Sequence, residues 1–303
     1  MNLFQSSSLH TINADKPLTT FKKRMWWLCN RLNNACFPGV VFSNRIEIMP
    51  FTCDVSEQDW LSLPPKSSPS RVFSDLFWMK LPWGRIQNTL NEIQVYDIGC
   101  GHGRYSTRLK DYSDNRITSY TGVDVKPSKA WETLAVAQHH FIVAENTKNV
   151  VNLLDEKMNL IVSQSVLEHI EDDIILFKGI RDWIKQNRRE VIQVHLVPSE
   201  VCLEMYPYHG VRQYSSRTLS QISRYFLPFS KVYIFKLGGM RSYQLHLNYI
   251  TQPLKQNGVD LRDEQSEMYY NILKKSIIDD MYEHKGKPSF YALVIHSYPH
   301  VDL

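Results

Sequence analysis

The stretch from Val95 to Leu109, VYDIGCGHGRYSTRL, decides the fold. It begins as an apolar run typical of a buried strand and then carries glycine at positions 99, 101 and 103. Glycine lets the backbone turn sharply and approach a ligand closely. A dinucleotide-binding loop would read G-x-G-x-x-G, but Arg104 occupies the position of its third glycine. The spacing therefore predicts a strand, a ligand-binding loop and a helix, and it departs from the dinucleotide pattern.

An acidic residue, Asp124, lies at the end of the next predicted strand, SYTGVDV. The helix that begins near Gly103 offers free backbone amides and a positive dipole end to an anionic group of a ligand. An acid about twenty residues beyond such a loop can accept hydrogen bonds from both hydroxyls of a ribose. Together, the loop and Asp124 predict a nucleoside-containing cofactor across the carboxyl ends of the strands.

Short apolar runs alternate with longer amphipathic ones from about Ile93 onward. The predicted strands are IQVYDI, SYTGVDV, HHFIVAE, MNLIVSQS, EVIQVHLV, KVYIFKL and FYALVIHSY. This alternation predicts an α/β fold, with a mostly parallel seven-stranded sheet and helices on both faces. About fifty residues, 238–288, separate the last two strands, which is too long for a structureless loop. Because EQSEMYYNILKKSIIDDMYE within them has a helical pattern, we expect an inserted cap.

Residues 1–92 differ from the rest, and we expect an aromatic-rich N-terminal extension or cap beside a main domain of residues 93–303. In FKKRMWWLCNRL, Trp26 and Trp27 stand next to three basic residues. Two interpretations of residues 21–32 stay open. The segment is either a helix that contacts a membrane surface or a helix that packs its aromatic side on the main domain. The shortness of the basic cluster favours the second.

The composition is that of a soluble globular protein: 43% of the 303 residues are hydrophobic, 22% are charged, and the formal net charge is +4. The basic residues form no concentrated stripe, which disfavours nucleic acid as a partner. The five cysteines include no C-x-x-C pair, which argues against a zinc site or a disulfide framework. The N-terminus does not resemble a signal peptide, and no apolar run is long enough to span a bilayer. We therefore expect a cytoplasmic protein.

At the loop and the fourth predicted strand, the sequence resembles the class I S-adenosylmethionine-dependent methyltransferases. DIGCGHG, from Asp97 to Gly103, is similar to the first motif of that family, D-x-G-x-G-x-G. NLIVSQSVLEHIEDD is similar to the D-L-V-x-x-x-x-V-L-E-H motif of its small-molecule branch, with Asn159 in place of the first acid. The resemblance covers roughly residues 93–197 and the last strand. It implies a Rossmann-like fold with S-adenosyl-L-methionine as the cofactor.

The resemblance also implies which residues bind the cofactor. They are Asp97, Gly99, Gly101 and Gly103 at the methionine part, Asp124 at the ribose, Val125 and Glu145 at the adenine, and Ser163 and Gln164 near the transferable methyl group. The fourth-strand segment differs from the N-P-P-Y-type sequence of enzymes that methylate the amines of nucleic-acid bases. It also lacks the proline–cysteine pair of carbon-5 cytosine methylation. The sequence therefore disfavours base methylation.

Methyl transfer from a sulfonium needs proximity and alignment, and a hydroxyl acceptor must also lose its proton. His169, in LEHI, is one candidate base, and a structural role in orienting its loop is an equal alternative. His209, in MYPYHGVRQYSSRTL, is the preferred base, although it would alternatively only pack against Tyr206 and Tyr208. His195 lies inside the apolar run VIQVHLVP, where burial favours a core role over a catalytic one.

The loop around His209 also resembles related small-molecule methyltransferases, which often place a histidine and an arginine or asparagine before a helix start. On that basis Arg212 is a candidate anion anchor and Tyr214 a candidate substrate contact. No spacing of histidines and acids there is typical of a metal site, so no metal is predicted.

The predicted acceptor is a sugar or glycan intermediate or another small hydroxyl-bearing molecule. Aromatic residues make up 12% of the chain, and many lie in the two additions. Such residues suit the faces of sugar rings and also flat apolar acceptors. A quinone, phenol or amine is therefore the alternative acceptor. A catalytically silent scaffold is disfavoured because the glycines and Asp124 are present. Asp97 and Arg104 disfavour a nicotinamide oxidoreductase.

Overall fold

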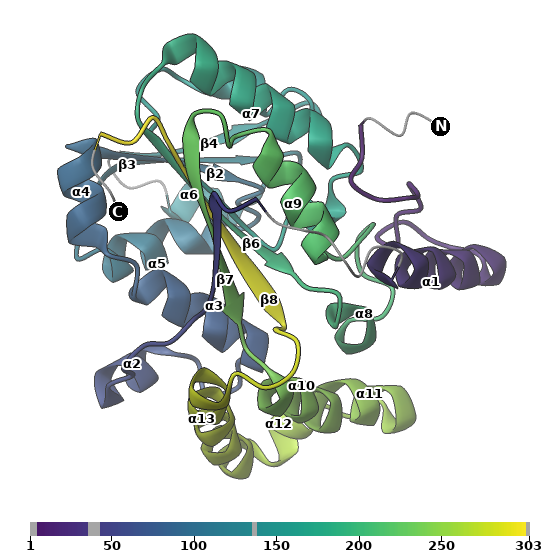
Figure 1. The fold of residues 1–303 in the computed structure, drawn as a ribbon. Helices are drawn as coiled ribbons and strands as arrows, with labels where there is room; N and C mark the ends of the chain where they lie inside the picture. Colours follow the sequence, from purple (N-terminus) through teal and green to yellow (C-terminus); the bar gives the residue numbers. More distant parts are fainter. Residues whose placement is uncertain (1–4, 36–42, 135–137, 301–303) are drawn as a thin grey trace.

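An eight-stranded sheet forms the centre of the molecule in the computed structural model, which describes residues 5–35, 43–134 and 138–300 (Figure 1). The strands are β1 Ile46–Pro50, β2 Ile93–Ile98, β3 Ile117–Asp124, β4 His139–Val143, β5 Leu160–Gln164, β6 Val191–Pro198, β7 Ser230–Leu237 and β8 Phe290–Ser297. Across the sheet their order is β1-β7-β8-β6-β5-β2-β3-β4. Strand β8 runs antiparallel to both of its neighbours, and the other neighbouring pairs are parallel.

The prediction of a mostly parallel Rossmann-like sheet is confirmed, but the predicted number of seven strands is one too few. The additional strand is β1, which comes from the N-terminal extension and pairs with β7 at the edge of the sheet. Its sequence, IEIMP, buries Ile46 alone among its five residues. Because an edge strand with so little burial has neither a continuous apolar run nor a clear alternation, its pattern did not identify it.

Helices cover both faces of this sheet. Their bounds are α1 Thr20–Ala35, α2 Glu57–Ser62, α3 Pro69–Met79, α4 Trp83–Leu90, α5 Arg104–Tyr112, α6 Ala130–Leu134, α7 Asp173–Asn187, α8 Cys202–Met205, α9 Ser216–Arg224, α10 Met240–His246, α11 Gln252–Asn257, α12 Leu261–Glu264 and α13 Ser266–Glu283. The 3₁₀ segments are η1 Val151–Leu153 and η2 Leu167–His169, and η3 Leu247–Thr251 is a π-helical segment. Helices α3, α4, α5 and α13 pack in one apolar core, and α7 and α9 pack in another. The amphipathic stretch PSKAWETLAVAQ, residues 127–138, also predicts a helix, and part of it lies outside the described residues.

The inserted helices lie beyond the carboxyl end of β7, and part of the N-terminal addition packs against them. Helices α10 to α13 stand between β7 and β8, in the predicted insertion, and Figure 1 shows them at the edge where β7 ends and β8 begins. Helix α3 of the N-terminal segment is buried along most of its length and contacts both α10 and α13. Since α3 shares one apolar core with β2 and β5, residues 1–92 help to build the body of the molecule as well as its surface.

Helix α1 turns one aromatic side chain inward. Trp26 is fully buried, and its indole N–H donates to the carbonyl oxygen of Gly210 at 2.9 Å. On the same helix Phe21 and Leu28 are exposed. The interpretation in which the helix packs an aromatic side chain on the main domain therefore describes Trp26, while contact of residues 21–32 with a membrane surface stays a prediction. Among the described residues, no helix is both long and apolar enough to cross a membrane.

Candidate active site

The glycine loop between β2 and α5 packs closely against the segment that follows β5. Gly99 has a φ of +73°, in the left-handed region that favours glycine, and a Cβ atom there would lie 2.0 Å from Cγ2 of Val166. The amide of Gly99 donates to the carbonyl oxygen of Val123 at 2.7 Å. The loop is therefore fixed between β3 and the turn after β5, and position 99 has no room for a side chain.

Asp124 at the end of β3 is hydrogen-bonded to this loop. Its Oδ2 accepts from the backbone N–H of Gly101 at 2.9 Å, and its Oδ1 accepts from that of Lys126 at 3.0 Å. The indole of Trp131 donates to the carbonyl oxygen of Gly101 at 2.8 Å from the other side. Val125 follows with 42% of its surface exposed. Loop and acid are thus neighbours in space, as their order in the sequence predicts.

A cavity of about 570 Å³ opens in front of the loop. It is lined by Pro64, Lys66, Ser67, Arg71, Asp97, Gly99, Cys100, Gly101, His102, Arg104, Tyr105, Arg108, Gln164 and Ser165. We call it the cofactor cavity. It brings together Asp97, Gly99, Gly101 and Gln164 from the predicted set. The other members of the predicted set are outside its lining, namely Gly103, Asp124, Val125, Glu145 and Ser163. Glu145 is exposed and accepts from the side-chain amide of Asn149 at 2.9 Å.

The carboxyl group of Asp97 lies at the base of the cofactor cavity. Asp97 is 3% exposed, and its Oδ2 accepts a hydrogen bond from the hydroxyl of Tyr120 at 2.5 Å. Burial raises the pKa of Asp97 to about 7, against the opposing effect of the Tyr120 hydrogen bond. This carboxyl group therefore changes its charge close to neutral pH.

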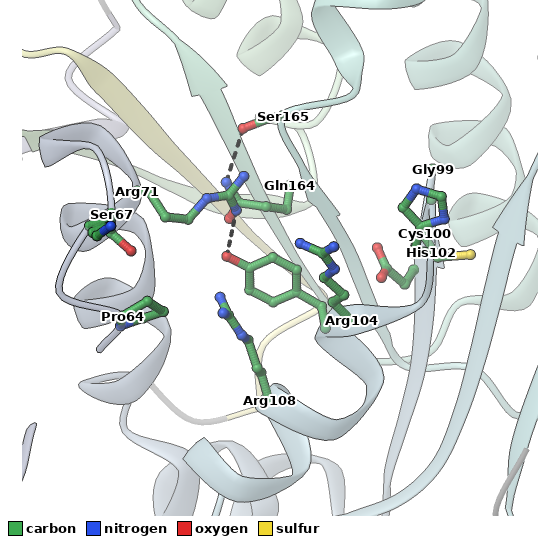
Figure 2. Close-up of a pocket in the computed structure, with 14 residues that line it drawn as sticks. Pro64, Ser67, Arg71, Gly99, Cys100, His102, Arg104, Arg108, Gln164 and Ser165 are labelled. Atoms are coloured by element: carbon green, nitrogen blue, oxygen red, sulfur yellow. Dashed lines mark hydrogen bonds between the residues drawn. The ribbon is translucent and has the colours of Figure 1, made fainter. Parts of the chain in front are cut away.

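Three arginines enter the cofactor cavity from two sides. Figure 2 shows Arg71 reaching in from α3, opposite Arg104 and Arg108 of α5. Arg71 donates to the hydroxyl of Tyr105 at 2.8 Å, and Arg108 pairs with the buried Asp75 at 3.1 Å. No pattern in the sequence indicated Arg71, because it lies in the extension and reaches the site only through the packing of α3.

A second cavity, of about 350 Å³, adjoins the first and shares Arg71, Gln164 and Ser165 with it. Its lining consists of Ser68, Ser70, Arg71, Ser74, Gln164, Ser165, Glu168, His169, Pro198, Tyr206, His209 and Phe290. We call it the acceptor cavity. Gln164 is fixed where the two meet, since its Oε1 accepts from the indole of Trp78 at 2.8 Å and its amide donates to Ser165 at 3.0 Å.

Both predicted catalytic histidines line the acceptor cavity, and two acids accompany them. Nδ1 of His169 and Oδ2 of Asp15 are 2.6 Å apart, while Oε1 of Glu168 is 3.9 Å from Nε2 of His169 and 3.9 Å from Nε2 of His209. The two imidazole rings meet edge-on, with centroids 4.6 Å apart. Asp15 also accepts from the backbone N–H of Gly210 at 3.1 Å. We call Asp15, Glu168, His169 and His209 the histidine cluster.

Burial and mutual charge shift the pKa values within the histidine cluster. Burial raises the pKa of Glu168 to about 7, opposed in part by His169. Burial also acts to lower the pKa of His169, but the Asp15 hydrogen bond and the charges of Glu168 and Asp15 outweigh it and raise that pKa. Burial lowers the pKa of His209. The sequence did not identify Asp15, because it is 154 residues from its partner and no local pattern marks it.

The structure corrects three predicted site residues. Arg212 is fully buried and donates to the carbonyl oxygens of Ile170 at 2.6 Å and Glu171 at 2.7 Å, so it braces the turn after β5 and does not reach a ligand. Tyr214 is also fully buried, and its hydroxyl donates to Asp173 at 3.1 Å. Both side chains hydrogen-bond to buried polar groups of the core, and these bonds anchor the loop around His209.

The third correction is Ser163, which does not lie near the transferable methyl group. It is fully buried in β5, and its hydroxyl is 2.8 Å from Nδ1 of His195. Successive side chains of a strand point to opposite faces, so Gln164 reaches the cavities and Ser163 cannot. His195 lies in the core, as expected from its apolar strand, and burial lowers its pKa to about 3.

Residues 96–187 match the family model described as "Methyltransferase domain". The match spans the glycine loop, Asp124 and two members of the histidine cluster, Glu168 and His169. The chain therefore contains a methyltransferase domain, in agreement with the predicted activity. Its cofactor is S-adenosyl-L-methionine.

Several solved methyltransferase structures are similar to this methyltransferase. One from Archaeoglobus fulgidus, a SAM-dependent methyltransferase, is 17% identical, with 77% of this chain and 96% of that chain covered and a TM-score of 0.46. The plantazolicin methyltransferase BamL is 14% identical, with 80% and 94% covered and a TM-score of 0.44. Phosphoethanolamine N-methyltransferase 2 of Haemonchus contortus is 15% identical, with 82% and 61% covered and a TM-score of 0.42. No curated protein matches the chain.

Proposed function

We propose that this methyltransferase transfers the methyl group to a hydroxyl group of a polar acceptor, namely a sugar or glycan intermediate. The observation that carries the proposal is the lining of the acceptor cavity. Apart from Pro198 and Phe290, every lining side chain is polar or charged. Such groups can hydrogen-bond a molecule with many hydroxyls, and they would be left without partners beside an acceptor that lacks them.

The two rings in the same cavity suit a sugar as well. Tyr206 and Phe290 add flat surfaces on which the apolar face of a sugar ring can pack. The hydroxyl of Tyr206 lies 2.8 Å from that of Ser70, so its ring is held in place from α3. A quinone or other aromatic phenol would leave more of the polar lining groups without partners.

The positive charge at the junction favours an acceptor that also carries an anionic group. Arg71 borders both cavities, and Arg104 and Arg108 stand beside it in the cofactor cavity. The cofactor brings one carboxylate to this region, where Arg71 and Arg104 stand beside Arg108, whose charge is paired with Asp75. Phosphorylated and nucleotide-activated sugars have the additional anionic group that such planar, bidentate donors recognise.

In the proposed reaction, the acceptor oxygen attacks the methyl carbon of the sulfonium from the side opposite to sulfur. The new carbon–oxygen bond forms as the carbon–sulfur bond breaks, and S-adenosylhomocysteine is released. The hydroxyl proton must leave as well, and the histidine cluster is the group in the acceptor cavity at which it can be lost. The two cavities supply proximity and alignment, which account for most of such catalysis.

The test uses S-adenosylmethionine labelled in its methyl group, incubated with the purified protein and an extract of the source cells. The extract is then separated into glycan and glycolipid, small apolar, protein and nucleic-acid fractions, and each fraction is treated with alkali. We expect label in the glycan fraction that resists alkali, because methyl ethers are stable there and methyl esters are not. Asp124→Ala should remove the label, whereas Asp182→Ala, a substitution at an exposed side chain, should not.

The other outcomes separate the alternatives. Label in small apolar molecules would overturn the sugar acceptor in favour of a quinone or phenol. Label that alkali releases would indicate a carboxyl acceptor in place of a hydroxyl. An absence of label in every fraction, although S-adenosylhomocysteine binds, would favour a catalytically silent scaffold.

A further inference from the structure

We propose that Glu168, His169 and His209 form a binding site for one divalent transition-metal ion, with Asp15 holding His169 in position. The ligand atoms would be one carboxylate oxygen of Glu168 and Nε2 of each histidine. All three residues line the acceptor cavity, which leaves an open side of the site toward the acceptor.

Two of the three distances between the proposed ligand atoms are close to those of a metal site. Oε1 of Glu168 is 3.9 Å from each of the two Nε2 atoms. In a tetrahedral site with metal–ligand distances of about 2.1 Å, two ligand atoms lie about 3.4 Å apart. Each contact therefore has to shorten by only about half an ångström. One potential ligand atom from each of Asp15, His169 and His209 also lies within 4.8 Å of the other two.

The carboxylate of Glu168 independently indicates a missing positive partner. Its side chain is 1% exposed, and Oε2 has no hydrogen-bond partner within the described part of the chain. A buried carboxylate oxygen without a partner is costly, and buried charges are normally paired or coordinate a metal. An ion bound to Oε1, the oxygen that faces both imidazoles, would neutralise this buried carboxylate.

Asp15 gives His169 the orientation that a ligand needs. Its Oδ2 lies 2.6 Å from Nδ1 of His169, and its Oδ1 accepts from the backbone N–H of Gly210 at 3.1 Å. A carboxylate that accepts from Nδ1–H fixes the tautomer in which Nε2 has a free lone pair. This arrangement of carboxylate, histidine and ion is the usual outer support of a metal-binding histidine.

The chemistry of the three ligands indicates the class of ion. Two imidazole nitrogens and one carboxylate oxygen suit zinc, cobalt, manganese or iron, whereas calcium and magnesium prefer oxygen ligands alone. Three protein ligands with an open fourth position are typical of catalytic zinc sites, and a closed set of four is typical of structural ones. The ligand at the open position would come from the acceptor cavity.

The role of the ion rests on the proposed function, although its binding does not. An acceptor hydroxyl bound to the ion becomes more acidic, as bound water does. The hydroxyl proton then passes to water, and the oxygen attacks the methyl carbon while S-adenosylhomocysteine leaves. The histidines act in this scheme as ligands, so the acceptor hydroxyl can ionise at neutral pH without a histidine as base.

Binding of cobalt(II) to tag-free protein stripped of metal tests the site. We expect one cobalt ion per chain, with the visible d–d absorption of a low-coordinate site, and displacement of cobalt by zinc. His209→Ala and Glu168→Gln should each weaken cobalt binding at least tenfold, because each removes one of three ligands. His140→Ala, which removes an exposed histidine of β4, should leave it unchanged.

Binding of S-adenosylhomocysteine to the same samples separates the two proposals. We expect the wild type and both site variants to bind it equally, since none of these residues lines the cofactor cavity. If the wild type binds it but gives no cobalt absorption, or if His209→Ala binds cobalt as tightly as the wild type, the metal site is wrong. If the wild type binds cobalt as expected but no S-adenosylhomocysteine, the proposed function fails and the site stands.

Discussion

The cofactor cavity and the acceptor cavity meet at Gln164 and Ser165, yet they are assembled in different ways. On the cofactor side, the hydrogen bond from Gly101 to Asp124 joins residues 23 positions apart within one strand–helix–strand unit. On the acceptor side, the contact between Asp15 and His169 joins residues 154 positions apart. The cofactor side is therefore formed by consecutive elements, whereas the acceptor side is formed by segments that are far apart in the sequence.

Because of this difference, we expect a substitution on one side to leave the properties of the other side largely unchanged. The glycine loop and Asp124 are held by β3 and by Trp131. The histidine cluster is held by the N-terminal segment and by the loop that carries Gly210. Because few contacts are shared, a change on the acceptor side should alter turnover or stability while cofactor affinity stays near that of the wild type.

The largest effect is expected from Arg212→Met, which tests whether this residue braces the fold of the acceptor side. Arg212 pairs with the buried Asp173 at 3.3 Å and donates to the carbonyl oxygen of Ile170. Removing one member of a buried pair leaves the other charge uncompensated, so the free energy of unfolding should fall by about 3–5 kcal/mol. Urea unfolding measures it.

A matched control for Arg212 is Arg181→Met. Arg181 pairs with Asp182, whose side chain is 62% exposed. An exposed pair contributes about 0–1 kcal/mol, so this variant should unfold nearly as the wild type does. If Arg212→Met were as stable as the wild type but bound the acceptor more weakly, its original interpretation as an anion anchor would be restored.

Gly99→Ala should produce the next largest effect, on the cofactor side. The new Cβ would lie 2.0 Å from Cγ2 of Val166, and the residue would keep a φ of +73°. The loop must therefore move, and we expect the affinity for S-adenosylhomocysteine to fall at least a hundredfold in a calorimetric titration. At Gly84 in α4 an added Cβ meets nothing within 4 Å, so Gly84→Ala should bind normally. Equal affinity of both variants would show that the loop is not tightly fixed.

The contrast between the two sides also explains what the sequence could predict. Strand alternation located seven of the strands, and the order of elements predicted that the glycine loop and Asp124 lie side by side, because these features are set by contacts between neighbouring elements. The pattern failed for β1, a short edge strand that buries one residue. It also failed for Ser163, although the alternation of β5 places it on the face opposite to Gln164.

The acceptor side was predictable only in part. His169 and His209 could be singled out because each stands in a loop after a strand, where ligands bind in open α/β sheets. Arg212 and Tyr214 stand in the same loop, and nothing local distinguishes a polar side chain that lines a cavity from one that satisfies buried carbonyl groups. Asp15 reaches the cluster through contacts of a distant segment, which no spacing in the sequence encodes.

Asp15→Asn should have an intermediate effect, confined to the acceptor side. The amide can no longer fix the tautomer of His169 as a carboxylate does, and loss of such an outer partner typically costs about 10–100-fold in metal affinity or activity. We expect that loss in kcat and in cobalt affinity, with the affinity for S-adenosylhomocysteine unchanged. Lys16→Ala, which breaks the adjacent exposed pair with Glu171, is the control and should change neither quantity. A parallel loss of cofactor affinity in Asp15→Asn would contradict the separation of the two sides.

The smallest effect is a pH dependence of cofactor binding. Burial raises the pKa of Asp97 to about 7, and the resemblance to the family implies that its carboxylate meets the cationic methionine part of the cofactor. The carboxylate is present above that pKa and is lost as the pH falls through it, so the affinity for S-adenosylhomocysteine should be about tenfold lower at pH 6 than at pH 8. Asp97→Asn has no charge to lose, so it should bind weakly at both pH values. A wild type with equal affinity at both would mean that the ionised form of Asp97 makes no contact with the cofactor, and that the loop amides and Asp124 hold the cofactor without it.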